Sequence, residues 1–479
     1  MKIKKSYILI TVLILIFLLI LSPRINNPYP IHIDEWHHIT ESIQLENHSP
    51  KGISAAKAGF HYILNFLDTF TDLILIYKFL PAFWGVIIAL TLFYITKNQT
   101  KFLRHSFLIA ITTIIFFASI KSNTNIAGLW FFTPLTFSIP FIYLYIHFFS
   151  KGIREENKKL IFYSLLIMLF LIPIHSISVL FSIPIIVIFS LFNLNYLKKE
   201  YKLFLSFLAI PLAGVIFYMK IMKLKIIPAI KDILSNLQFK HGFGVLEANN
   251  SPLELYSLLG YFLATLGIIF IITNKENLKK YLIYLIWPIT LIISILIFKQ
   301  TGISFLSPYQ RNLYYLAISL PFLSSLGLYY LITKIKQTNL NHQTKNLVIV
   351  ITILVILFLT FQSYYYLPET MQLYENINQD NFEALQFLKT QPFQPGTKVI
   401  APALIATTIF PITNHQPLAT TFFYGDRNLL FQFFLSEGCD TKNQIIKDYK
   451  VYYVLTEQKI NCNWEVIYNK KNNIIYKTD

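Results

Sequence analysis

Long apolar runs recur along this chain, separated by short polar segments that contain lysine and arginine. A helix needs about 20 predominantly apolar residues to cross roughly 30 Å of hydrocarbon. The apolar runs predict about eleven transmembrane helices, at roughly 6–22, 78–96, 106–121, 126–148, 160–174, 177–193, 203–219, 254–273, 281–298, 310–332 and 346–366. We therefore expect an α-helical polytopic membrane protein.

The charges of the connecting segments predict the direction of these helices. The segments at 97–104, 151–159, 198–202, 275–280 and 334–345 each carry three or four cations, whereas three short connections on the opposite side carry one or none. Cytoplasmic loops carry the excess of lysine and arginine. This pattern places the N-terminus in the cytoplasm. The first apolar run has no cleavage site after it, so we expect it to remain as a membrane span of a multi-pass protein in the cell membrane.

The composition of the chain supports a membrane protein and argues against a nucleic-acid-binding protein. The chain is 54% hydrophobic and 14% charged, whereas soluble proteins carry about 25% charged residues. The net charge of +17 would fit a nucleic-acid-binding protein. The cations lie mainly in the short loops between spans, however, so positive-inside bias explains the charge and we expect no nucleic-acid partner.

Two long outer loops and a C-terminal segment interrupt the pattern of spans. Within the first loop, 23–77, residues 33–45 predict an amphipathic helix, and residues 60–76 predict an apolar stretch lying at the surface, broken by Asp68 and Asp72. The second loop, 220–253, carries five lysines and would face an anionic lipid head group. The expected domains are a transmembrane domain, 1–366, and a small soluble α/β domain, 367–479, outside the membrane.

The soluble domain has recognisable elements of its own. Residues 381–389 predict a helix capped by Asp380 or Asn381, and strands are expected at 398–401, 451–455, 464–468 and 474–476, the last two forming a hairpin. The only cysteines of the chain, Cys439 and Cys462, both lie here. An extracytoplasmic compartment permits a disulfide between them, although two unpaired thiols remain the alternative.

A dense cluster of ionisable residues follows the first span directly. Asp34 and Glu35 are adjacent, with His32, His37 and His38 around them. Neighbouring side chains on a helix point about 100° apart, so the two carboxylates cannot both aim at one atom. Asp34 and Glu35 are the candidate catalytic residues, one as base or metal ligand. The plainer alternative is a solvated helix start with a capping aspartate.

Other polar residues could complete a site on the outer face. Histidines spaced as in His-Glu-x-x-His are absent from the cluster, so a zinc protease is disfavoured. Mg²⁺ or Mn²⁺ suits an oxygen-rich site better, with Asp34 and Glu247 as candidate ligands. Arg311 has the geometry to bind a lipid phosphate, or else reaches the interface from the outer end of a span. The candidate substrate-binding residues are His37, His38, His61, Glu247 and Arg311.

Topology and short motifs together resemble the GT-C superfamily of membrane glycosyltransferases. An acidic pair follows the first span in Ile33-Asp34-Glu35-Trp36-His37, Phe60-His61-Tyr62 resembles the return towards the membrane, and Arg311 opens a late span. The segment 245–247 shares only its final glutamate with a motif of oligosaccharyltransferases. Their Trp-Trp-Asp motif is absent, because Glu465 and Val466 follow Trp464. The similarity to the protein-glycosylating branch is therefore weak.

This resemblance implies a reaction and its partners. The enzyme would be a hexosyltransferase that transfers a sugar from a polyprenyl-phosphate or polyprenyl-diphosphate donor to a glycan, lipid or protein acceptor on the extracytoplasmic face of the bilayer. Asp34 would activate the acceptor or hold a metal, and Arg311 with loop lysines would neutralise the lipid phosphate. A transporter or flippase of a lipid-linked or polar solute is the alternative, although no internal repeat supports it. A non-catalytic relative is a third possibility.

Overall fold

Apolar helices make up one unit of the chain, and a second unit contains a mixed sheet with helices. The computed structural model describes residues 4–27, 29–47, 58–120, 131–202, 255–337, 376–392, 396–420 and 425–478, with scattered positions in 205–240 and 341–358. The membrane unit comprises Met1–Ser22, Pro50–Phe60 and Leu80–Leu367, and the C-terminal unit comprises Pro23–Ser49, His61–Phe79 and Pro368–Asp479. The C-terminal unit therefore includes most of the described part of the first long loop as well as the end of the chain.

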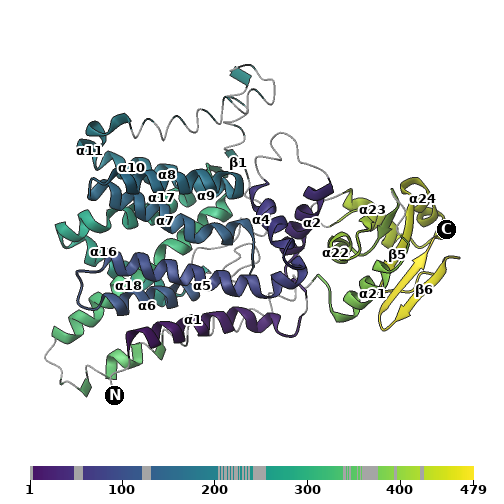
Figure 1. Cartoon of the computed structure of the whole chain (residues 1–479), viewed down its shortest axis with the longest axis horizontal. Coiled ribbons are helices and arrows are strands. Elements are labelled where there is room, and N and C mark those ends of the chain that lie inside the picture. Colours follow the sequence, from purple (N-terminus) through teal and green to yellow (C-terminus); the bar gives the residue numbers. More distant parts are fainter. Residues whose placement is uncertain are drawn as a thin grey trace. The chain divides into compact units, whose positions relative to one another are not determined.

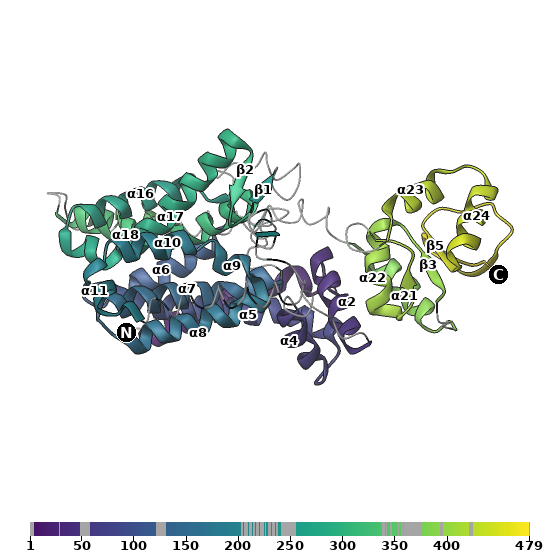
Figure 2. The same cartoon turned by 90° about the horizontal axis from the view of Figure 1, so that it is seen from above.

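Apolar helices dominate the membrane unit, and its longest ones run side by side (Figures 1 and 2). Five helical segments of the described chain are long and apolar enough to cross a membrane: Lys5–Arg24, which contains α1 (Lys5–Leu21) and η1 (Ser22–Arg24), α5 (Leu73–Gln99), α8 (Lys158–His175), α17 (Lys275–Thr301) and α18 (Tyr309–Gln337). Further helices of this unit are α6 (Ser106–Ala118), α7 (Pro134–Arg154), α9 (Ile177–Leu180), α10 (Ile183–Leu191), α11 (Leu194–Lys199) and α16 (Leu258–Ile272).

The predicted spans agree with these helices to different degrees. The span expected at 78–96 lies within the longer α5, and the one expected at 177–193 is divided into α9 and α10. The spans expected at 203–219 and 346–366 fall largely outside the described residues. The total of eleven therefore stays a prediction.

Close backbone contact joins α16 and α18, and two glycines make it possible. A Cβ atom on Gly267 would collide with the carbonyl oxygen of Leu323, and one on Gly327 would collide with the carbonyl oxygen of Leu263. Small residues let apolar helices approach closely enough for extensive van der Waals contact. Beside them, the Ser324 hydroxyl donates to the Gly260 carbonyl at 2.9 Å. The helix pair is thus fixed by shape and by a buried hydrogen bond.

The C-terminal unit contains a five-stranded sheet in the order β4-β3-β5-β7-β6. Its strands are β3 (Lys398–Ile400), β4 (Gln416–Pro417), β5 (Val451–Thr456), β6 (Glu465–Lys470) and β7 (Asn473–Lys477). Strand β3 is parallel to β4 and β5, while β5–β7 and β7–β6 are antiparallel. Helices α21 (Gln379–Lys389), α22 (Ala403–Thr413), α23 (Arg427–Leu435) and α24 (Cys439–Tyr449) accompany the strands. The predicted strands and hairpin are confirmed.

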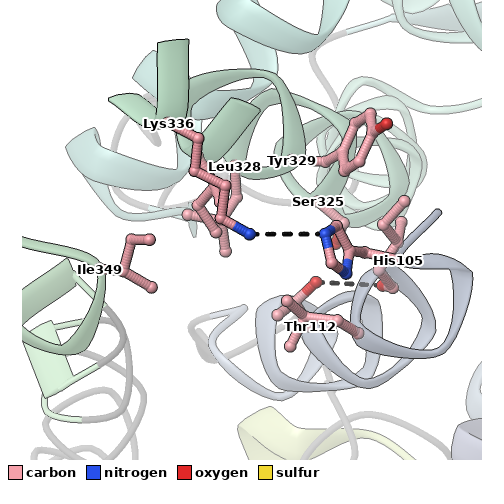
Figure 3. A pocket seen from close by; sticks show the side chains of 10 residues that line it. His105, Thr112, Ser325, Leu328, Tyr329, Lys336 and Ile349 are labelled. Carbon is pink, nitrogen blue, oxygen red and sulfur yellow. Dashed lines mark hydrogen bonds between the residues drawn. The ribbon is translucent and has the colours of Figure 1, made fainter. Parts of the chain in front are cut away.

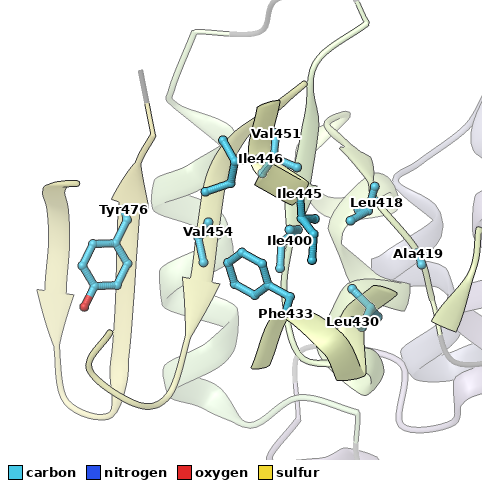
Figure 4. Packing of buried hydrophobic residues seen from close by; sticks show 10 residues of the cluster. All are labelled: Ile400, Leu418, Ala419, Leu430, Phe433, Ile445, Ile446, Val451, Val454 and Tyr476. Atoms are coloured by element: carbon cyan, nitrogen blue, oxygen red, sulfur yellow. The ribbon is translucent and has the colours of Figure 1, made fainter. Parts of the chain in front are cut away.

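One hydrophobic cluster and one disulfide hold this part of the unit together. Ile400, Val454 and Tyr476 from the strands pack with Phe433 from α23 and Ile445 from α24 (Figure 4). Cys439 at the start of α24 is bonded to Cys462 in the segment before β6. The disulfide alternative for the two cysteines is therefore the one present in the structure.

The cap of α21 differs from the prediction. Asn378, rather than Asp380 or Asn381, is the N-cap: its side chain accepts a hydrogen bond from the Asn381 amide at 2.8 Å, and the Asn381 side chain accepts one from the Asn378 amide at 2.9 Å. This reciprocal pair satisfies two amides that have no partner within the helix. Asn381 therefore lies inside the helix as the second half of the capping box.

Candidate functional site

Helix α2 (Ile33–Asn47) carries the ionisable cluster and begins where the amphipathic pattern predicts. Its apolar residues Trp36 and Ile39 are fully buried, and the helix packs against α22 of the C-terminal unit. The ring Nδ1 of His32 accepts a hydrogen bond from the Asp34 amide at 3.1 Å. This bond satisfies one of the amides left open at a helix start, where acidic side chains are also favoured.

Glu35 forms a fully buried ion pair with Arg24. Its two carboxylate oxygens lie 2.8 and 3.1 Å from guanidinium nitrogens of Arg24, and one of them also accepts a hydrogen bond from the Ile31 amide at 3.3 Å. Arg24 donates further to the backbone carbonyl of Tyr77 at 3.1 Å. Glu35 therefore connects the segment after α1 to the starts of α2 and α5.

Asp34 has the opposite environment. Its side chain is 43% exposed, whereas that of Glu35 is 0% exposed. The Nδ1 atom of His32 lies 3.8 Å from the Asp34 carboxylate. Helical geometry sends adjacent side chains in different directions, and here that difference leaves Asp34 as the carboxylate of the pair that is open to a ligand.

Three histidines form a chain of ring contacts, and the first of them, His37, feels the charge of Asp34. The rings of His37 and His38 are 5.3 Å apart, those of His38 and His61 are 5.2 Å apart, and His38 Nδ1 is hydrogen-bonded to His61 Nε2 at 3.0 Å. His61 belongs to α4 (Gly59–Asp68). Its backbone carbonyl also accepts a hydrogen bond from the Ser42 hydroxyl at 3.2 Å. These contacts join α4 to α2.

Burial controls the protonation of this group. It lowers the pKa of His37 to about 4, against a smaller opposing effect of the Asp34 charge. Burial, with a smaller contribution from His37, lowers the pKa of His61 to about 4. Both rings are therefore neutral near pH 7 and provide hydrogen bonds rather than positive charge.

A small pocket opens beside these residues, between α2 and the C-terminal sheet region. It has a volume of about 40 Å³, and α2 contributes His37, Thr40, Glu41 and Gln44 to it. The opposite wall comes from Thr407, Phe410, Gln416, Pro417 and Thr420. Burial raises the pKa of Glu41. Hydroxyl, amide and carboxyl groups around one aromatic ring suit a ligand with several hydroxyl groups.

The remaining predicted site residues, Arg311 and Glu247, do not belong to the C-terminal unit. Arg311 is half-buried in the first turn of α18, at the start of a span as expected, and belongs to the membrane unit. Ahead of it, β1 (Gln238–Lys240) pairs with β2 (Ile303–Phe305), so that the backbone of Lys240 lies opposite Ile303. Glu247 falls outside the described residues. The structure thus brings together Asp34, Glu35, His37, His38 and His61.

Two parts of this site were missed by the sequence analysis. Arg24 has only one sequence signal, its place directly after a span, which is also where an arginine reaches to the interface without further role. The pocket residues Thr407 and Gln416 carry no sequence signal that links them to α2, because they lie more than 350 positions from it along the chain.

A metal site is not evident among the described residues, where no three His, Cys, Asp or Glu side chains gather as ligands.

Comparison with known proteins places this architecture. No protein-family model matches the chain, and no curated protein matches its sequence. Among solved structures, ArnT from Cupriavidus metallidurans bound to undecaprenyl phosphate matches with a TM-score of 0.54 at 11% identity, over 99% of this chain and 98% of that one. The Archaeoglobus fulgidus oligosaccharyltransferase tethered to an acceptor peptide matches with a TM-score of 0.55 at 13% identity, over 94% and 69% of the two chains.

The chain has the GT-C fold. A third structure agrees, the archaeal oligosaccharyltransferase AglB from Archaeoglobus fulgidus in complex with an inhibitory peptide and a dolichol-phosphate, with a TM-score of 0.51 at 15% identity over 94% and 69% of the chains. Another structure of the Archaeoglobus enzyme contains zinc and sulfate. The sequence resemblance is thereby confirmed for the fold, and the apolar helices agree with a multi-pass membrane protein.

Proposed function

We propose that this protein is a membrane glycosyltransferase that transfers a sugar, as a hexosyltransferase does, from a polyprenyl-phosphate or polyprenyl-diphosphate donor to an acceptor on the extracytoplasmic face. The observation that carries the proposal is the similarity to ArnT, which extends over nearly the whole length of both chains. That enzyme was solved with undecaprenyl phosphate and the archaeal enzyme with dolichol-phosphate. A lipid phosphate carrier is the chemistry that these neighbours share.

In this proposal Asp34 is the carboxylate that activates the acceptor. The acceptor oxygen attacks the anomeric carbon of the sugar, the bond from that carbon to the phosphate oxygen breaks, and its electron pair stays with the lipid phosphate. The proton of the acceptor hydroxyl passes to Asp34. Its exposure of 43% and its place beside the pocket support this role. A positioned general base typically contributes 10²–10⁴-fold to a rate.

Glu35 has a positioning role in the same proposal. Its carboxylate is already engaged by Arg24 and the Ile31 amide, and its side chain is 0% exposed. An acceptor could reach it only after that buried ion pair had opened. We therefore assign Glu35 to holding the start of α2, and Asp34 to the chemistry.

The phosphate and the acceptor are bound by different groups. Arg311 would neutralise the charge that develops on the leaving lipid phosphate, as charge-assisted hydrogen bonds from arginine do. Lysines of the loop 220–253 would add positive charge for the same phosphate. The polar pocket with Glu41 and Phe410 would receive a hydroxyl-bearing part of the acceptor.

The proposed mechanism does not use a divalent cation, and the experiment below tests whether one is needed. Mg²⁺ and Mn²⁺ prefer several oxygen ligands. Within the described residues around α2, Asp34 offers such oxygens, while those of Glu35 are bonded to Arg24. The donor set described here does not by itself make a Mg²⁺ site. The pairing of Asp34 with Glu247 stays a prediction.

The test is sugar transfer in membranes from a panel of polyprenyl-phosphate and polyprenyl-diphosphate sugars, with wild type, Asp34→Asn and the matched control Asp72→Asn. Asp72 caps the start of α5 through the Ile74 amide at 2.7 Å, a bond that asparagine can also make. We expect the rate of sugar transfer to fall at least 100-fold in Asp34→Asn and to stay near the wild-type rate in Asp72→Asn.

The possible outcomes separate the parts of the proposal. Transfer that stops on adding a chelator, and returns when Mg²⁺ or Mn²⁺ is added back, would show that a divalent cation takes part in the reaction. Transfer that survives Asp34→Asn would keep the enzyme and remove this site. Wild type that transfers no sugar from any donor, with a full set of acceptors present, would overturn the proposed function.

A further inference from the structure

A second recess lies in the membrane unit. It has a volume of about 70 Å³ and is formed by α6, α18 and the segment that contains Ile349. Its walls are apolar along most of its length, from Leu108, Ile109, Leu328 and Ile332 together with Ile349. Ile109, Leu328 and Ile332 are buried, whereas Leu108 is 37% exposed and forms the open side of the recess.

One end of the recess is basic. Lys336 from the last turn of α18 and His105 before α6 reach towards each other, with Lys336 Nζ 3.5 Å from His105 Nε2 (Figure 3). Ile349 lies across the recess on its separate segment (Figure 3). The two side chains come from positions 231 residues apart, so the fold has to bring them together.

The surroundings of this end are cationic and contain no acid in the adjoining sequence. The segments 97–106 and 329–337 carry Lys97, Lys101, Arg104, Lys334 and Lys336, and neither has an aspartate or glutamate. Partial burial and the charges of Lys336 and Arg104 lower the pKa of His105. Positive potential thus converges on the mouth of an apolar recess.

We propose that this recess binds an anionic phospholipid, with its phosphate at Lys336 and His105 and an acyl chain along the apolar wall. The charge of a phosphate is complementary to that of Lys336, and the neutral His105 ring can donate or accept a hydrogen bond. Basic pockets between transmembrane helices bind lipid head groups in this way. A diffuse positive-inside surface would need neither the recess nor the convergence of α6 and α18. The proposal does not depend on the proposed function.

The experiment is native mass spectrometry of the full chain, released from nanodiscs that contain equal amounts of phosphatidylglycerol and phosphatidylcholine. Wild type is expected to retain phosphatidylglycerol preferentially. Lys336→Gln should weaken that preference about fivefold, the effect of removing one cation near a membrane surface. The matched control is Lys275→Gln, because Lys275 is an exposed lysine at the start of α17 that does not line the recess.

A second variant tests the apolar wall. Leu108 is 37% exposed, so Leu108→Trp should fill the recess without disturbing the buried core. This variant should lose the bound lipid although Lys336 is still present. Equal retention of both lipids by wild type would overturn the proposal. An equal loss in Lys275→Gln and Lys336→Gln would also overturn it, because the preference would then come from surface charge alone.

Discussion

The buried pair of Arg24 and Glu35 gives the sharpest prediction. Glu35→Gln keeps the size of the side chain but leaves the Arg24 guanidinium charged and buried without its counter-ion. Both side chains are 0% exposed, and two charge-assisted contacts of 2.8 and 3.1 Å are lost. Removing one partner of a buried ion pair typically costs about 3–5 kcal/mol. We expect the thermal unfolding midpoint of the C-terminal unit to fall by roughly 6–20 °C.

A double-mutant cycle separates this structural role from a catalytic one. Arg24→Met combined with Glu35→Gln removes the uncompensated charge, so the double variant should regain much of the lost stability, with a coupling free energy of about 2 kcal/mol or more. Fluorescence melting in detergent gives the midpoints, and sugar transfer is measured on the same samples below the lower midpoint.

One result would refute the reasoning about Glu35. If Glu35→Gln melts at the wild-type temperature and yet transfers no sugar, Glu35 takes part in the chemistry directly. If instead stability and transfer fall together in Glu35→Gln and return together in the double variant, the role of the pair is to hold α2 in place.

Three further predictions concern other parts of the molecule. Gly327→Ala should destabilise the membrane unit by about 1–3 kcal/mol, because the added Cβ would collide with a carbonyl of α16. The control Gly438→Ala should melt like wild type in detergent, because a Cβ at that position meets nothing within 4 Å. Acidification should destabilise the fold, because burial lowers the pKa of His61 to about 4 from an unfolded value of about 6.5. The free energy of unfolding is therefore unaffected by this ring above pH 6.5 and falls by up to about 3 kcal/mol as the pH drops to 4. His61→Gln should flatten this part of the plot of melting temperature against pH, and an unchanged plot would contradict the burial of the ring. Replacing Cys439 and Cys462 by serine should cost about 2–4 kcal/mol, since the disulfide closes a loop with a sequence separation of 23, and thermal melting of the oxidised wild type beside the variant measures the difference.

Local patterns in the sequence determine much of this protein. The length of apolar runs predicts α1, α5, α8, α17 and α18, because crossing a bilayer imposes a minimum length on any helix. Short runs of β-branched and aromatic residues predict β5, β6 and β7, and the amphipathic spacing predicts α2. These signals are short-range, and each element carries its own.

Contacts between distant segments are decided only by the tertiary structure. Asp34 and Glu35 are neighbours of similar chemistry, and only the partner Arg24 and the burial of α2 show which carboxylate is engaged and which is open. The hydrogen bond of His38 to His61 and the pocket formed with Thr407 likewise join segments that carry no mutual signal. The physical reason is that burial and charge pairing depend on which elements pack together, and one sequence does not specify that locally.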